Sequence, residues 1–226
     1  MDTNPKGTEK VMLKYKTLRY VTLVLFLVGL GLIGKGTYIH AKARAAEYLL
    51  RSSWQDTIEK GIDIKPWPWA DTWPVARMIV PEHGIDLVVL EGASGNVLAF
   101  GPGHLTPSSL PGQPGNSIIS GHRDTSFRFL ERVRVGERIT MQTQDGSMVS
   151  FKVIDTQIID QAVLDLNIKA DIPLLTLATC YPFDAVIPGG PERYLVFAEL
   201  DEETMALVSK NDMSITPQKA VMSSSY

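Results

Sequence analysis

The stretch ERITMQTQDGSMVSFKVIDTQII (137–159) contains two strand-like segments, 137–144 and 147–159, joined by the dipeptide Asp145-Gly146. Asp-Gly between two such segments is a strong signal for a β-hairpin, because the tight hairpin turns need residues that tolerate a positive φ. The stretch therefore predicts a pair of antiparallel strands in the second half of the chain.

Further strand candidates lie on both sides of this hairpin. Short runs bounded by Gly, Pro or other turn residues are typical of strands. Glu82-His83-Gly84 is a tight-turn signal between the first two candidates, and the third follows a Gly/Pro-rich loop. The candidates are VARMIVP (75–81), IDLVVLE (85–91), SIISGHR (117–123), PLLTLATC (173–180) and ERYLVFAEL (192–200).

Strands outnumber helices in this part of the chain, so the predicted fold class is mainly β. DTSFRFLER (124–132) is expected to form a short helix with Asp124 or Thr125 as its N-cap. A closed barrel would leave no unpaired edge in a sheet of this many strands.

An apolar segment precedes the strands. Residues 20–34 carry no charge, and the run 20–39 reaches the roughly 20 residues that a membrane-spanning helix needs if Lys35 snorkels to the interface. The preceding leader is basic, which favours a cytoplasmic N-terminus and an extracytoplasmic remainder, periplasmic in an inner membrane. A cleaved signal peptide is the alternative, since small residues at 41–46 would permit cleavage.

The segment after the apolar run differs from both its neighbours. Residues 40–60 are rich in Ala, Leu and charge and predict a helix, whereas the three prolines of DIKPWPWADTWPV (63–75) exclude a regular helix or central strand. The predicted organisation is a cytoplasmic leader (1–19), a transmembrane anchor (20–39), a helical and Pro/Trp-rich linker (40–66), a catalytic β-domain (67–200) and a C-terminal tail (201–226).

The composition excludes several kinds of site. The 22 basic and 25 acidic residues give a net charge of −3, so no basic excess points to nucleic acid. The single cysteine, Cys180, excludes an intramolecular disulfide and a four-cysteine zinc site. The four histidines show no metal-binding spacing, and no acidic cluster compels a calcium site, so we expect no metal and no cofactor.

Three residues carry side chains suited to covalent catalysis. Cys180 and His122 each end an apolar strand candidate, and Arg193 starts one only 13 positions after the cysteine. An imidazole beside a thiol can raise its thiolate fraction and later give a proton to a leaving amine, while an arginine can stabilise a developing oxyanion. Taken singly, each residue also fits a structural role: a buried thiol, a loop histidine and an edge-strand arginine.

Taken together, the strings around these residues resemble the sortase family. TLATC (176–180) is similar to the sortase signature TLxTC, SGHRD (120–124) to the segment that carries the catalytic histidine, and Arg193 in ERYLVF stands where the family has its arginine. The loop AFGPGHLTPSSLPGQPGN (99–116) resembles the one before the histidine strand. WPWADT and TCYPF suggest the Gram-negative branch, class GN.

The resemblance implies an eight-stranded β-barrel with an N-terminal membrane helix. It also implies a cysteine transpeptidase that cleaves an LPxTG-like sorting signal of an exported protein between Thr and Gly. Cys180 would be the nucleophile, His122 the acid and base, and Arg193 the oxyanion partner, while His104 would be structural or a secondary polar group. The amine acceptor is not specified.

Two other functions are compatible with the same residues. A cysteine peptidase on the same barrel would release a free carboxylate instead of an acyl–amine conjugate. A membrane-anchored binding domain without activity would leave Cys180 buried and unreactive.

Overall fold

The computed structural model describes residues 5–164, 166–186 and 189–201, and the side chains from residue 18 onward. The expected C-terminal tail lies outside the described residues except for Asp201. The chain divides between Tyr48 and Leu49 into two compact units, which are considered separately. Helix α1 (Pro5–Lys60) starts in the first unit and ends in the second.

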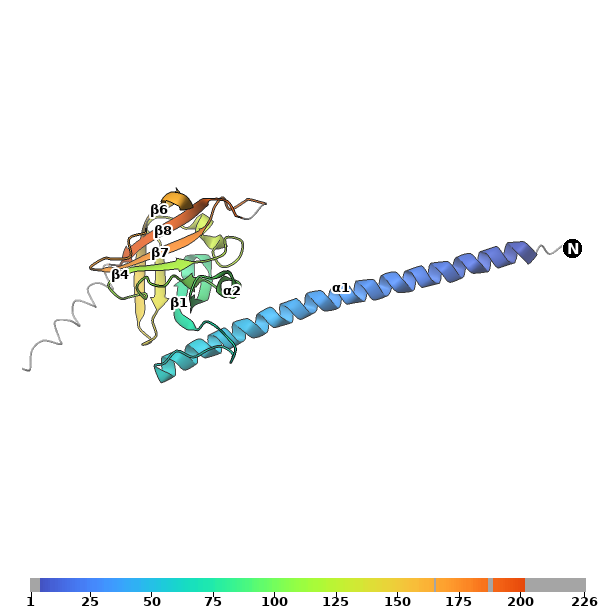
Figure 1. Ribbon diagram of the computed structural model, residues 1–226, viewed down its shortest axis with the longest axis horizontal. Helices are drawn as coiled ribbons and strands as arrows, with labels where there is room; N and C mark the ends of the chain where they lie inside the picture. Colours follow the sequence, from blue (N-terminus) through green and yellow to red (C-terminus); the bar gives the residue numbers. More distant parts are fainter. Residues whose placement is uncertain (1–4, 165, 187–188, 202–226) are drawn as a thin grey trace, which may run out of the picture. The chain divides into compact units, whose positions relative to one another are not determined.

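The first unit is the N-terminal part of α1 (Figure 1). Its large apolar side chains, such as Leu25, Phe26 and Ile33, are 66–68% exposed to solvent. By length and composition this is the one described helix that could cross a membrane. The described part of the expected leader (5–19), the expected span (20–39) and the first part of the expected linker (40–60) form one continuous helix.

The second unit is a closed β-barrel, which confirms the predicted fold class. The strands are β1 (Pro74–Val80), β2 (Ile85–Glu91), β3 (Gly103–His104), β4 (Gly115–Ser120), β5 (Arg138–Gln142), β6 (Met148–Asp160), β7 (Pro173–Cys180) and β8 (Glu192–Leu200). The helical turns are α2 (Gly95–Leu98), η1 (Pro81–His83), η2 (Arg128–Arg132) and η3 (Gln161–Val163).

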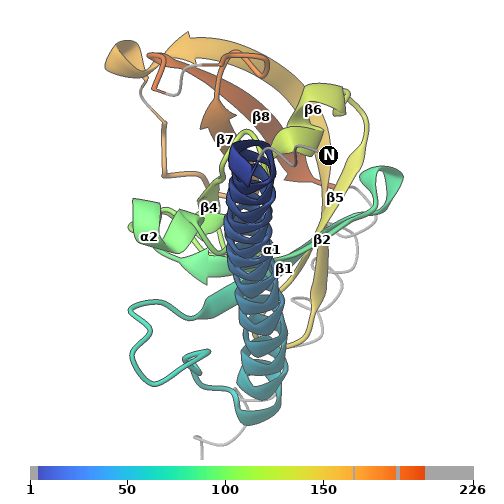
Figure 2. The ribbon, with the colours of Figure 1, turned by 90° about the vertical axis from the view of Figure 1, so that its right-hand side faces the viewer.

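The strands follow the order β1-β2-β3-β4-β7-β8-β6-β5 around the barrel. Most neighbours are antiparallel, but β4 and β7 run parallel, as do β2 and β3. Figure 1 shows β4, β7, β8 and β6 side by side, and in Figure 2 β4 and β5 lie on opposite sides of the barrel. The strand β7 therefore pairs along one edge with β4, from a distant part of the chain, and along the other edge with β8, the next strand in the sequence.

The predicted hairpin joins β5 to β6. Thr143 N donates to Ser147 O at 2.9 Å, and Gly146 N donates to Thr143 O at 2.9 Å. Gly146 has φ 83°, a conformation that glycine adopts without the steric cost that a side chain brings. The Asp145-Gly146 signal thus marks the turn correctly.

The barrel interior is packed with large apolar side chains. Alternate residues of each strand point inward, and the inward side chains from opposite walls meet in one cluster. Its fully buried members include Met78, Phe127, Ile139, Met141, Phe151 and Leu177.

A second, smaller apolar cluster lies on the outside of the barrel. The last turns of α1 place Leu50 and Trp54 against Val88 and Leu90 on the outer face of β2. Trp54 is 2% exposed, and its indole N–H donates to Gln142 Oε1 at 3.2 Å. The end of α1 is therefore an integral part of the barrel domain.

The expected helix 124–132 is shorter than predicted and of a different type. It is the 3₁₀ turn η2, which begins at Arg128 and has no side-chain N-cap. Neither Asp124 nor Thr125 caps it: the backbone N–H groups of Thr125 and Phe127 donate to His122 O at 3.3 and 3.0 Å, and the Asp124 carboxylate accepts from Arg123. The prediction was wrong because the chain first turns to bury Phe127 in the core.

This turn allows no side chain at Gly121. A Cβ at Gly121 would lie 2.6 Å from the Phe127 ring, closer than real Cβ atoms approach. Phe127 is fully buried, so the ring has little freedom to move away. The backbone just before His122 is thus fixed by packing against the core.

We expect Trp54→Ala to destabilise the domain by about 3–5 kcal/mol, because it leaves a cavity between α1 and the barrel. Trp69→Ala is the matched control, since Trp69 is 83% exposed. Urea unfolding followed by circular dichroism would measure both. An unchanged midpoint for Trp54→Ala would show that the end of α1 is not part of the domain.

We expect Gly121→Ala to destabilise the domain by about 1–3 kcal/mol through overpacking against Phe127. Gly95→Ala is the control, because a Cβ at Gly95 in α2 meets nothing within 4 Å. The same urea titration compares the two variants. If both unfolded at the wild-type urea concentration, the tight contact at Gly121 would be refuted.

Candidate active site

Cys180 is the last residue of β7 and is partly exposed. Leu175 and Leu177 on the same strand belong to the interior cluster. Because side chains alternate along a strand, Thr176, Ala178 and Cys180 face outward. The thiol is therefore at the rim of the barrel on its outer face, and not in the core.

Arg193 lies directly opposite Cys180 in the antiparallel pairing of β7 with β8. Side chains directly opposite each other point to the same face, with Cβ atoms about 4.5–5.5 Å apart. The pairing extends beyond Cys180, since Tyr181 N donates to Glu192 O at 3.0 Å. The register thus holds the arginine beside the cysteine.

The Arg193 guanidinium has three polar contacts. Nη1 donates to the carbonyl oxygens of Gly190 at 2.8 Å and Glu192 at 2.9 Å, and Nη2 donates to the Gln161 side-chain oxygen. Gln161 begins η3, directly after β6. These contacts use the two terminal nitrogens and fix the plane of the guanidinium. The sequence analysis did not identify Gln161, because a lone glutamine in a loop carries no signal.

His122 follows the end of β4, which pairs with β7 in parallel, with Ser120 opposite Ala178. The pairing continues one step further: Gly121 N donates to Ala178 O at 3.1 Å, and the Thr179 hydroxyl donates to Gly121 O at 2.8 Å. His122 is two residues after Ser120, and Cys180 is two residues after Ala178. His122 and Cys180 therefore lie side by side at the ends of the two strands.

The side chain of His122 points away from the core. The Cβ direction of the preceding Gly121 points at the buried Phe127 ring, and successive side chains alternate. The imidazole is exposed, and among the described residues none forms a hydrogen bond with it. His122, Cys180 and Arg193 therefore lie at the same end of three adjacent strands, on the same outer face.

The loop after Cys180 is held by an aromatic cluster. The Tyr181 and Tyr194 rings stack with centroids 6.3 Å apart, and Phe183 packs edge-on against Tyr194 at 5.2 Å. Phe183 is 6% exposed. The residues that follow Cys180 are thus held by aromatic packing against Tyr194 on β8.

His104 has the contacts of a structural residue. It is 3% exposed on β3, with Nδ1 3.1 Å from Glu91 Oε2 and Nε2 3.0 Å from Ser109 O. The Ser108 hydroxyl lies 3.1 Å from Nε2 and accepts from Ile118 N at 3.1 Å. These bonds connect β2, the loop before β4 and β4 itself.

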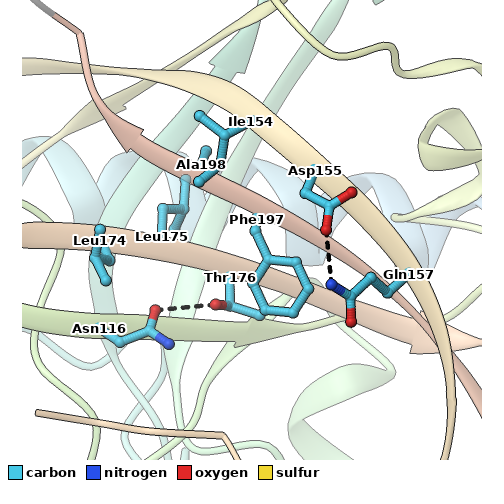
Figure 3. A pocket seen from close by; sticks show the side chains of 9 residues that line it. All are labelled: Asn116, Ile154, Asp155, Gln157, Leu174, Leu175, Thr176, Phe197 and Ala198. Atoms are coloured by element: carbon cyan, nitrogen blue, oxygen red, sulfur yellow. Dashed lines mark hydrogen bonds between the residues drawn. The ribbon is translucent and has the colours of Figure 1, made fainter.

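A pocket lies further along the outer face of the same strands (Figure 3). Thr176 on β7 and Phe197 on β8 are cross-strand partners, and both share the face of Cys180. The Thr176 hydroxyl donates to Asn116 Oδ1 at 3.0 Å. The lining is mostly apolar: Asn116, Ile154, Asp155, Gln157, Leu174, Leu175, Thr176, Phe197 and Ala198.

Within the described part of the chain, no group of three or more His, Cys, Asp or Glu side chains could hold a metal ion. The arrangement of thiol, imidazole and guanidinium at one rim is suited to acyl transfer through a thioester.

Comparisons with known proteins agree with this fold. The chain is similar to Sortase D of Bacillus subtilis (strain 168), with 28% identity over 121 residues, which are 53% of this chain and 60% of that relative. The match thus spans less than two thirds of the relative's length. The structure of a Sortase D5 transpeptidase from Clostridium perfringens superposes with a TM-score of 0.56 over 70% of this chain and 97% of that one, at 21% identity.

A further match is to the structure of Sortase A from Corynebacterium diphtheriae, with a TM-score of 0.53, 28% identity, and coverage of 59% of this chain and 63% of that one. The family model described as the sortase domain matches residues 78–201, which is more than half of the chain. That range contains all but the start of the barrel together with His122, Cys180 and Arg193, and the chain therefore belongs to the sortase family.

Proposed function

We propose that this chain is a membrane-anchored cysteine transpeptidase with Cys180 as nucleophile, His122 as acid and base, and Arg193 as the oxyanion partner. The observation that carries the proposal is that the three side chains lie at the same rim of the barrel. The ends of β4, β7 and β8 bring these three side chains to one face in a chain of the sortase family.

The first half-reaction forms a thioester. The Cys180 thiolate attacks the carbonyl carbon of the scissile residue, and a C–S bond forms. The tetrahedral intermediate then collapses as the peptide C–N bond breaks, and the leaving amine takes a proton from protonated His122. The exposed position of the imidazole gives a bound substrate direct access to it.

The second half-reaction releases the acyl group. An incoming amine gives its proton to His122 and attacks the thioester carbonyl, which frees the Cys180 thiolate. Arg193 stabilises the oxyanion in both steps, since its charge does not depend on pH and its guanidinium is already oriented by Gly190 and Gln161.

The proposed substrate is an LPxTG-like sorting signal at the C-terminus of an exported protein, cleaved between Thr and Gly. With Thr at Cys180, the Leu of an extended peptide lies three residues, or about 10 Å, away. Thr176 is four residues before Cys180 on β7, about 13 Å along the strand. The apolar side chains of Leu174 and Phe197 around that point suit a leucine.

The proposed location is an inner membrane that α1 crosses once, with the N-terminus in the cytoplasm and the barrel on the periplasmic side. The long apolar stretch of α1 supports a span, and the basic leader supports the orientation. WPWADT and TCYPF favour the Gram-negative branch of the family.

Transfer and hydrolysis share the thioester, so the products distinguish them. A conjugate between acyl group and amine indicates a transpeptidase, and a free carboxylate indicates a hydrolase. Transfer requires that the amine reach the thioester before water does.

We expect Cys180→Ala to abolish cleavage of an LPxTG peptide, because no other cysteine can form the thioester. His122→Ala should lose about 10²–10⁴-fold, and Arg193→Ala about 10²–10³-fold. Arg193→Lys should restore little, because lysine lacks the planar fork. Mass spectrometry of the peptide, the amine conjugate and the acyl-enzyme measures each step.

The control for this series is Arg134→Ala, which removes an exposed arginine elsewhere on the barrel. It should retain wild-type turnover. Wild-type turnover in Cys180→Ala would disprove the proposed nucleophile.

We expect the full chain to fractionate with membranes and to need detergent for extraction, whereas a variant without residues 1–40 should be soluble and folded. The packing of α1 on the barrel begins only at Leu50, so the deletion leaves it intact. Circular dichroism and ultracentrifugation test both statements. A mature N-terminus near Ala45 would instead show a cleaved signal peptide.

A further inference from the structure

Arg123 is a buried arginine in the turn after His122, with its side chain 7% exposed. Its Nε and Nη2 donate to the two carboxylate oxygens of Asp124 at 2.9 and 3.2 Å. Its Nη1 donates to Pro182 O at 2.7 Å, and Nη2 also donates to Ala185 O at 3.0 Å. One guanidinium therefore joins the segment after His122 to the loop after Cys180.

This number of bonds is what a buried guanidinium requires. A charge removed from water is costly unless it is paired and its donors are satisfied. Two backbone carbonyls and one carboxylate, fixed in different directions, match the planar fork of arginine but not the single ammonium of lysine. The geometry is specific to arginine.

Arg128 strengthens the same connection. Its Nη1 donates to Phe183 O, and its guanidinium carbon lies 6.0 Å from the centre of the Phe183 ring. Three carbonyl groups of the loop after Cys180 thus accept bonds from arginines that follow His122. Arg128 is half exposed, whereas Arg123 is buried, so the buried residue is the more rigid of the two.

Arg123 also interacts electrostatically with the thiol. Its pKa is raised above the ordinary value, mainly by the hydrogen bond to Asp124 and further by the negative charges of Asp124, Cys180 and Asp184. The same hydrogen bond holds the pKa of Asp124 below its usual range, which keeps the carboxylate ionised.

We propose that Arg123 is a positioning residue of the site: it ties the loop after Cys180 to the turn that carries His122, and so fixes the thiol relative to the imidazole. The roles of Cys180 and His122 in this statement rest on the proposed function. Arg193 lies on β8, whereas Arg123 lies in the turn after β4, so the two arginines belong to different strands of the site.

The first test is hydrogen exchange of the backbone amides in the loop 181–186, in the full-length chain in detergent. We expect faster exchange in both Arg123→Lys and Arg123→Gln, because neither side chain can hold both carbonyls and Asp124.

The second test is turnover of the LPxTG peptide. We expect kcat to fall by about 10²-fold in both variants with KM little changed, since Arg123 contacts the loop and not the substrate.

The control is Arg132→Gln, which removes an exposed arginine from η2 in the same segment. It should keep the wild-type exchange rates and kcat.

Wild-type loop exchange in folded Arg123→Lys would overturn the proposal, and this variant decides it even if Arg123→Gln does not fold. Hydrogen exchange needs no substrate. A wild-type chain that cleaves no LPxTG peptide would therefore count against the proposed function without affecting the exchange test.

Discussion

The pairing of β7 along both of its edges is the constraint on which the rest of the site depends. One edge pairs in parallel with β4, and the other pairs in antiparallel fashion with β8. Because side chains alternate, a slip of one residue would turn Cys180 toward the interior and Leu177 toward solvent. The burial of Leu175 and Leu177 in the core therefore fixes which face of the barrel carries the thiol.

The backbone of the rim is held tightly although the side chains at its surface are accessible. Gly121 packs closely against the Phe127 ring, and its carbonyl oxygen accepts a hydrogen bond from the Thr179 hydroxyl. His122 itself is exposed, so its position comes from the backbone on which it stands and not from hydrogen bonds to its ring. In the proposed mechanism this arrangement leaves the imidazole accessible for proton transfer while its Cα stays in place.

The sequence predicts the strands best where packing demands continuous apolar residues. The ranges 85–91, 173–180 and 192–200 agree residue for residue with β2, β7 and β8. The two-residue strand β3 carries no periodic signal, and the helix expected at 124–132 was wrong because the burial of Phe127 overrode local propensity. Likewise, SGHRD points to His122, but nothing local shows that Arg123 reaches a loop some sixty residues away.

Both arginines near the thiol are held by backbone carbonyls, and this has a chemical consequence. A flexible cation free to approach a thiolate would form a close ion pair with it and compete with the substrate for the sulfur. Arg193 is bound to the carbonyls of Gly190 and Glu192, and Arg123 to those of Pro182 and Ala185. Both guanidinium groups are thus held in place by the backbone, so in the proposed mechanism the sulfur remains available to attack the substrate.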